Sequence, residues 1–154
     1  MKRHLLYVLS VLVALVAVAT ASAGPNGSDD GTMCVLNTQL SAANETTGST
    51  STATGHAQIK VRNDGTIEWN VFVLNPDAET FVAGHIHRAP AGVPGPVVQP
   101  LHMSGATDDR QIRDTGETST AGGLGAAICA DPSAYYVNYH TTAFPGGAVR
   151  GQLG

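Results

Sequence analysis

The sequence predicts an all-β protein, an antiparallel Greek-key-like β-sandwich or barrel of about seven to eight strands. Apolar and polar residues alternate with a period of two through several short stretches. Clusters of Gly, Pro, Asn and Asp separate these stretches, and the chain contains 18 glycines and 8 prolines. Apolar residues spaced three or four positions apart, as in an amphipathic helix, are rare. Together these observations favour short strands joined by turns over a helical or mixed fold.

The clearest element is a β-hairpin over residues 56–74. Ile59 and Val61 alternate with polar neighbours, and after Asn63-Asp64-Gly65 the alternation resumes with Trp69 and Val71. An Asp-Gly pair readily supplies the positive φ angles that a hairpin turn requires. The apolar side of the alternating strands gives the predicted core, which comprises Ile59, Val61, Trp69, Val71, Val73, Val137 and Val149.

The same patterns predict the remaining elements. Further strands are expected at residues 35–40, 81–87, 96–101, 135–140 and 148–153. Residues 121–130 favour a short helix or a turn, although glycines weaken helical propensity there. Gly146 and Gly147 are expected to form the turn into the last strand.

The N-terminus has the pattern of a secretory signal peptide. Lys2 and Arg3 precede an apolar run over residues 5–19, and Ala21-Ser22-Ala23 is a small-residue cleavage site. The run is too short to span a bilayer comfortably. We therefore expect residues 1–23 to be a signal peptide, residues 24–32 a flexible leader, and residues 33–154 one domain. Secretion to a periplasmic or extracellular location follows, with no membrane span after cleavage.

The charge balance argues against two classes of partner. The chain has 12 acidic and 8 basic residues, and cleavage would remove Lys2 and Arg3 from the basic set. An acidic domain is a poor match for nucleic acid or for an anionic membrane surface. The chain also lacks the Gly-x-Ser-x-Gly pattern of a nucleophile elbow and the glycine–lysine pattern of a phosphate loop.

Cys34 and Cys129 both belong to the part expected to be exported. An oxidising compartment favours joining them, so we predict a Cys34–Cys129 disulfide. Metal binding is the weaker alternative, because the two cysteines are distant in sequence and neither lies in a Cys-x-x-Cys motif.

A candidate metal site begins with His85 and His87. Residues two apart on a strand point to the same face, so both imidazoles can face one ion. The ordinary alternative is two solvent-facing histidines. His140, at the end of another predicted strand, would complete a three-nitrogen site that suits copper or zinc. His102 is a fourth candidate ligand, although a surface loop position is the interpretation we favour for it.

Two longer stretches resemble a known family. GHIHRAPAGVPGPVVQPL and YYVNYHTTAFPGGAVRGQL are similar to the CHRD domain, the module repeated in chordin and found singly in many exported microbial proteins. The resemblance covers about residues 34–154. It implies a secreted β-domain whose biochemical role is poorly defined.

A fainter similarity is to Cu,Zn superoxide dismutase, a Greek-key β-sandwich. That family also has a Gly-x-His-x-His strand, a later copper-ligand histidine and, near its end, an arginine that guides the anion. By this resemblance His85, His87 and His140 would bind copper and Arg150 would be the catalytic anion guide. The cysteine that follows the arginine in the dismutase is missing here, and the zinc subsite lacks its ligands. Both departures weaken the expectation of rapid dismutation.

Three functions remain open from the sequence. The first is an exported copper-binding protein using the three histidines, and the second is a dismutase-like redox enzyme at the same site. The third is a metal-free interaction or matrix module. In that case Arg150 pairs with a carboxylate such as Glu68, and His140 donates to a backbone carbonyl. Whether the protein is an enzyme is left open.

Overall fold

The computed structural model describes residues 31–101, 103–120 and 122–154, and within them eight strands form a single antiparallel sheet. The strands are β1 (Thr32–Ser41), β2 (Thr54–Arg62), β3 (Thr66–Leu74), β4 (Phe81–Arg88), β5 (Val97–Leu101), β6 (Gln111–Ser119), β7 (Tyr135–Thr141) and β8 (Val149–Gln152). Short helices are η1 (Ala42–Asn44), α1 (Leu124–Ala130) and η2 (Pro132–Ala134). The predicted all-β class is confirmed.

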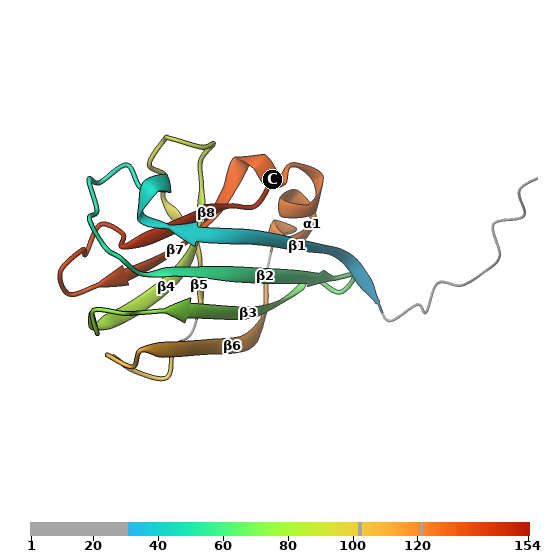
Figure 1. Cartoon of the computed structure of the whole chain (residues 1–154). Coiled ribbons are helices and arrows are strands. Elements are labelled where there is room, and N and C mark those ends of the chain that lie inside the picture. The colour runs from blue at the N-terminus through green and yellow to red at the C-terminus, as the bar shows by residue number, and fades with distance from the viewer. Residues whose placement is uncertain (1–30, 102, 121) are drawn as a thin grey trace, which may run out of the picture.

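The sheet curls into a nearly closed barrel. Its strand order is β5-β4-β7-β8-β1-β2-β3-β6, and Figure 1 shows β4, β5 and β7 lying behind β1, β2 and β3. The chain crosses from β3 to β4 and again from β6 to β7, which gives the sheet its Greek-key-like order. β7 therefore pairs with β8, the next strand along the chain, and with β4, which is distant in the sequence.

The barrel interior holds the predicted core. All seven predicted core residues are buried, and the β2–β3 hairpin provides five of them. Its turn occupies Asn63-Asp64-Gly65 as expected, with Gly65 at a φ of 86°. A side chain on the strands of this hairpin either enters the interior or faces outward, which matches the alternation in the sequence.

Strand β6 is absent from the sequence prediction. Its inward positions are Ile112, Asp114 and Gly116, so a single large apolar residue marks its inner face. Gly116 is required because a Cβ there would lie 2.3 Å from the Trp69 ring. Asp114 accepts hydrogen bonds from Trp69 Nε1 at 3.3 Å and from the Tyr139 hydroxyl at 2.6 Å. Alternation in the sequence could not reveal a strand whose inner face is mostly polar or empty.

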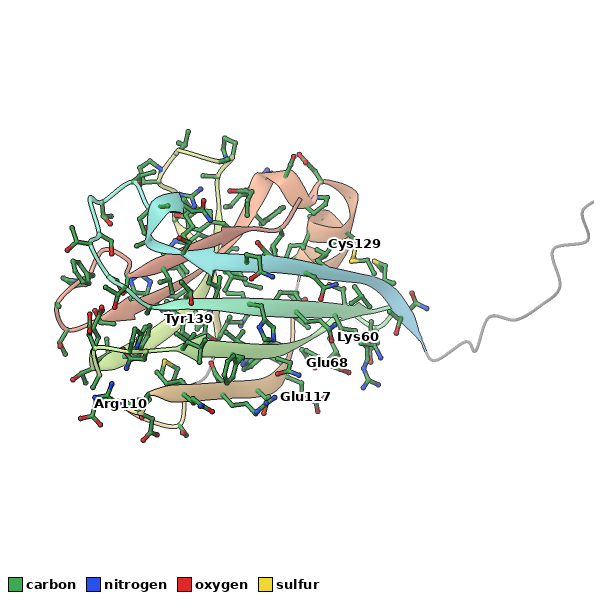
Figure 2. All side chains as sticks on the ribbon, in the orientation of Figure 1. Lys60, Glu68, Arg110, Glu117, Cys129 and Tyr139 are labelled. Carbon is green, nitrogen blue, oxygen red and sulfur yellow. A yellow bond between two sulfur atoms is a disulfide. The ribbon has the colours of Figure 1, made fainter. Side chains whose placement is uncertain are left out.

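The predicted disulfide is confirmed. Cys34 on β1 joins Cys129 on α1, with the two Cα atoms 5.9 Å apart. Figure 2 shows this bond at the labelled Cys129, beside the β1 strand. Residues 124–130, where the sequence favoured a helix or a turn, form α1. The disulfide holds this short helix against the first strand across a sequence separation of 95 residues.

The structure does not test the predicted boundaries of the signal peptide, the leader and the domain. The signal peptide at residues 1–23 and most of the leader at residues 24–32 lie outside the described residues, so both stay predictions. At the end of that leader, Thr32 already pairs with Arg62 in the β1–β2 ladder. Among the described residues, no helix has the length and apolar character needed to cross a membrane.

Candidate metal centre

The three histidines lie on the outer face of two paired strands. His85 and His87 are on β4 and His140 is on β7, and Ile86 between the first two points into the core. The ladder places His85 opposite Asn138 and His87 opposite Tyr136. The histidines, Asn138 and Tyr136 therefore share the face of the sheet that is turned away from the barrel interior.

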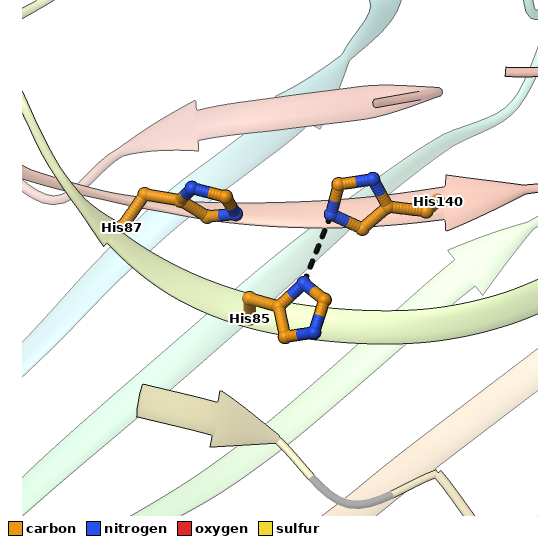
Figure 3. A group of neighbouring side chains, drawn as sticks. All are labelled: His85, His87 and His140. Atoms are coloured by element: carbon orange, nitrogen blue, oxygen red, sulfur yellow. Dashed lines mark hydrogen bonds between the residues drawn. The ribbon is translucent and has the colours of Figure 1, made fainter. Parts of the chain in front are cut away.

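Antiparallel pairing brings His140 beside the other two histidines. One nitrogen from each ring can be chosen so that all three lie within 4.8 Å of one another. Figure 3 shows the rings of His87 and His140 directed toward each other, with His85 next to both. His85 Nδ1 lies 3.0 Å from His140 Nε2. The convergence expected of these histidines is present, whereas their role as metal ligands stays a prediction.

Backbone carbonyls fix two of the imidazoles. His87 Nδ1 donates to the Gly95 carbonyl at 2.9 Å, and His140 Nδ1 donates to the Pro145 carbonyl at 3.1 Å. Because a carbonyl can only accept, each Nδ1 carries the proton and each Nε2 presents a lone pair. Metal-binding histidines are oriented in this way, with the second nitrogen bonded to a carbonyl or carboxylate. His87 Nε2 is buried and has no hydrogen-bond partner.

His85 completes the group in a different manner. Since His140 Nε2 presents a lone pair, the 3.0 Å contact requires that His85 Nδ1 carry a proton and donate it. A metal ion at the centre would take the place of that proton. The coordinating atoms would then be Nδ1 of His85 and Nε2 of His87 and His140.

The surroundings favour neutral imidazoles. Burial lowers the pKa of His140 to about 4, with His85 adding to the effect. Burial also lowers the pKa of His85 and of His87, and the nearby Arg150 charge lowers the pKa of His87 further. At neutral pH the three rings are therefore uncharged, which is the form that binds a metal ion.

Tyr136 and Arg150 form a stack against His87. The rings of His87 and Tyr136 are nearly parallel, with centroids 4.8 Å apart. The guanidinium carbon of Arg150 lies 3.4 Å from the Tyr136 ring centroid. The Gly95 N–H donates to the Tyr136 hydroxyl at 3.1 Å, while the Gly95 carbonyl holds His87. The stack and the loop that follows β4 thus fix His87 together.

Arg150 is buried, with 2% of its surface exposed. Its guanidinium donates to the carbonyls of Pro90 and Val93, each at 3.0 Å, and to the Gln152 side chain at 3.2 Å. The suggested pairing of Arg150 with Glu68 is wrong, because Glu68 forms its ion pair with Arg62 on β2. The geometry gives Arg150 a clamping role on the loop, and its role as an anion guide stays a prediction.

A second group of polar atoms lies beside the histidines. Asn138 is 3% exposed, and its Oδ1 has no partner. Across Gly147, a buried Oε1 of Glu45 also lacks a partner. Gly147 has a φ of 135°, and a Cβ there would lie 2.6 Å from both Asn138 Nδ2 and Glu45 Oε1, so the position favours glycine. Burial raises the pKa of Glu45 to about 7, against the opposing effect of Arg150.

Glu45 and Arg150 also line a surface pocket of about 460 Å³. The pocket lies between the β1–η1 segment and the loop after β4, and Gln39, Asn44 and Gln152 supply further polar groups. Because none of the three histidines lines it, the pocket is separate from the candidate metal centre.

Two further histidines, His56 and His102, do not add to the described site. His102 lies outside the described residues, so its role as a fourth ligand stays a prediction. His56 lies exposed on β2, where its ring contacts Phe72 at a centroid distance of 5.6 Å. The structure thus gathers three of the four proposed ligands.

Sequence reasoning missed the residues that surround the histidines. Tyr136 and Asn138 precede His140 by four and two positions, so strand periodicity could have placed them on the same face. Glu45 and the carbonyls of Gly95 and Pro145 left no comparable signal. Their contacts depend on loops that meet the site only after folding.

Comparison with known proteins identifies one family. Residues 36–153 match the family model of the CHRD domain. No curated protein and no solved structure matches the chain. The similarity to Cu,Zn superoxide dismutase that the sequence suggested therefore gains no support from these comparisons.

Proposed function

The chain belongs to the CHRD domain family, and we propose that it is an exported protein that binds one copper ion through His85, His87 and His140. The observation that supports this most is the buried, unpartnered Nε2 of His87, which lies close to nitrogens of the other two rings. Leaving a buried nitrogen unbonded costs about 1–3 kcal/mol. A bound metal ion would remove that cost.

The donor set favours copper over the other common ions. Three imidazole nitrogens without a carboxylate suit copper or zinc and are a poor match for calcium or magnesium, which prefer oxygen donors. Between the two candidates, a site of this type binds copper more tightly than zinc. Bound copper would be either a cargo that the protein stores or a redox centre. The protein's own residues hold the donors neutral and oriented.

Copper handling is favoured over dismutase-type turnover. An arginine that guides anions needs free N–H groups facing the metal, and three of the five N–H groups of Arg150 donate to loop carbonyls and to Gln152. The metal-free module is the remaining alternative. The bond from His140 to the Pro145 carbonyl fits both functions, but the metal-free alternative offers no partner for His87 Nε2.

Export is part of the proposal. The confirmed disulfide is of the kind that forms and persists outside the reducing cytosol. The predicted signal peptide supports the same location, which lies in the periplasm or outside the cell. Processing at residue 23, checked by mass spectrometry of the exported protein, would establish it.

Copper titration of the exported protein, after removal of metals by a chelator, tests the site. We expect one equivalent of Cu(II) to give an EPR spectrum with nitrogen hyperfine structure. In His87→Ala, loss of a ligand should weaken binding at least about tenfold in competition with a chelator. His56→Ala is the matched control, because it removes an exposed histidine on another strand and should change neither spectrum nor affinity.

The result that would overturn copper binding at this site is an unchanged spectrum and affinity in His87→Ala. Equal losses in the His87 and His56 variants would show that copper binds to surface histidines without a defined site. Superoxide consumption by the copper-loaded protein addresses the redox alternative. Activity no higher than that of free copper would rule that alternative out.

A further inference from the structure

The charges around the three histidines bear on the oxidation state of the ion. We propose that this site selects Cu(I) over Cu(II), and that Arg150, stacked behind Tyr136, sets much of that preference. The inference rests on the proposed copper binding and goes beyond it, because it names the ionic species that the protein holds. Three features of the described residues support it.

The first feature is the lack of negative charge among the donors. The ligand group consists of three neutral imidazoles and includes no Asp or Glu. His87 and His140 are each 8% exposed, so the centre lies in a poorly solvated environment. Cu(II) would leave two uncompensated positive charges there, whereas Cu(I) would leave one. Burying uncompensated charge is costly, and the cost rises steeply with the charge.

The second feature is the cation next to His87. The Arg150 guanidinium stays protonated in proteins, and it packs on the opposite side of the ring that stacks on His87. Its hydrogen bonds go to the uncharged oxygens of Pro90, Val93 and Gln152. No carboxylate within ion-pair distance of Arg150 is found in the described part of the chain. The Tyr136 ring lies 3.4 Å from the guanidinium carbon and 4.8 Å from the His87 ring, so the Arg150 charge is close to this ligand.

The third feature is the number of donors. Cu(II) prefers a tetragonal arrangement with four or more ligands, whereas Cu(I) has a filled d shell and accepts three. The two strands provide three nitrogens, each from a ring directed to the common centre. Two of these rings are held by carbonyls of separate loops, so the geometry is fixed before the ion arrives. A three-coordinate Cu(I) ion matches this arrangement.

The test compares affinities for the two oxidation states. Cu(I) affinity is measured without oxygen, in ascorbate, by competition with bicinchoninate, and Cu(II) affinity by competition with an aminocarboxylate chelator. We expect the intact protein to bind Cu(I) more tightly. Arg150→Gln should shift the ratio of the Cu(I) to the Cu(II) affinity toward Cu(II) by about tenfold, because it removes one nearby charge.

Three further variants separate charge from structure. Arg150→Lys retains the charge but loses the two-carbonyl clamp, so it should shift the ratio much less than Arg150→Gln. Glu45 interacts electrostatically with Arg150 and is ionised at pH 8.5, where its negative charge opposes that of the guanidinium. Glu45→Gln, measured at this pH, should therefore shift the ratio toward Cu(I). Arg62→Gln removes a cation that is paired with Glu68 on β2, and it should leave the ratio unchanged.

Tighter binding of Cu(II) by the intact protein would overturn the inference, and so would equal shifts in the Gln and Lys variants of Arg150. If Arg150→Gln fails to fold, the test rests on the change of the affinity ratio in Glu45→Gln. A change toward Cu(II), or no change, would then overturn the inference. In each case copper binding that depends on His87 would persist. Loss of the proposed function itself is distinct, because copper binding would then be insensitive to His87→Ala.

Discussion

The inner and outer faces of strands β4 and β7 differ in how completely their polar groups are hydrogen-bonded. On the inner face, the Tyr139 hydroxyl and the Trp69 indole N–H donate to Asp114, and the Tyr139 ring packs over Gly84. Burial and the Asp114 carboxylate raise the pKa of Tyr139 further above its ordinary value. On the outer face, His87 Nε2 and Asn138 Oδ1 have no partner. These polar groups of the inner face are hydrogen-bonded to one another, whereas two buried polar atoms of the outer face have no hydrogen-bond partner.

This difference separates residues needed for folding from residues available for binding. A fully bonded polar group inside the barrel stabilises one arrangement of the core. An unbonded group on the outer face lowers stability unless a ligand arrives. Substitutions on the inner face should therefore change the free energy of unfolding, and substitutions on the outer face should change metal affinity. Four predictions test this division.

Trp69→Ala should have the largest effect on stability. Trp69 is nearly fully buried, fills the space over Gly116 and bonds to Asp114. Its loss should lower the free energy of unfolding by roughly 3–5 kcal/mol. Urea unfolding followed by circular dichroism measures this, with the outer-face variant His85→Ala as the comparison. A loss below about 1 kcal/mol would mean that the interior repacks around the missing side chain and does not depend on the contacts of Trp69.

Metal-dependent stability tests the outer face. At a free copper concentration a hundred times the dissociation constant, the folded protein should gain about 3 kcal/mol. With binding at least about tenfold weaker, His87→Ala should lose at least about half of this gain while changing the stability of the metal-free protein little. Thermal unfolding with and without copper provides the comparison. An equal copper-dependent gain in the variant would show that the outer face is not the binding region.

Tyr139→Phe should have a smaller effect, confined to the inner face. The change removes the 2.6 Å bond to Asp114 and leaves that buried carboxylate with one fewer donor. The expected cost is about 1–3 kcal/mol. Because the hydroxyl points away from His140 into the barrel, copper affinity should not change. A loss of affinity together with stability would indicate that the two faces are coupled through β7.

At pH 4 Glu45→Gln should have the smallest effect of the four, and its effect should grow as the pH rises. The folded state holds the Glu45 proton up to about pH 7, whereas the unfolded chain releases it near the ordinary value of 4.5. Between these values the folded protein binds more protons, so Glu45 lowers stability progressively as the pH rises. The variant lacks this contribution. Its stability relative to the unsubstituted protein should therefore increase between pH 4 and pH 8.

Urea unfolding of both proteins in the presence of a metal chelator measures this difference. The pKa shifts of the histidines occur in both proteins and cancel in the comparison. A stability difference that is independent of pH would mean that Glu45 has the same pKa in the folded and unfolded states and is therefore ionised in the folded protein at neutral pH. The unpartnered Oε1 would then have to be stabilised in another way.

The sequence alone determined the β class, the β2–β3 hairpin, the core and the histidine pair. These are local properties, because strand alternation and a positive φ at Gly65 are set by neighbouring residues. The expected export of the segment that contains both cysteines also predicted their pairing. The resemblance to the CHRD domain was likewise visible in short stretches of sequence, and the family match over residues 36–153 confirmed it.

Only the tertiary structure decided that His140 lies next to His85 and His87, and what surrounds them. Their meeting requires β7 to pair with β4, which depends on the crossing from β6 to β7 and hence on strand order. The tautomers of His87 and His140 depend on carbonyls from two loops, and the place of Arg150 depends on Tyr136. Such contacts join residues distant along the chain, and periodicity in the sequence does not report them.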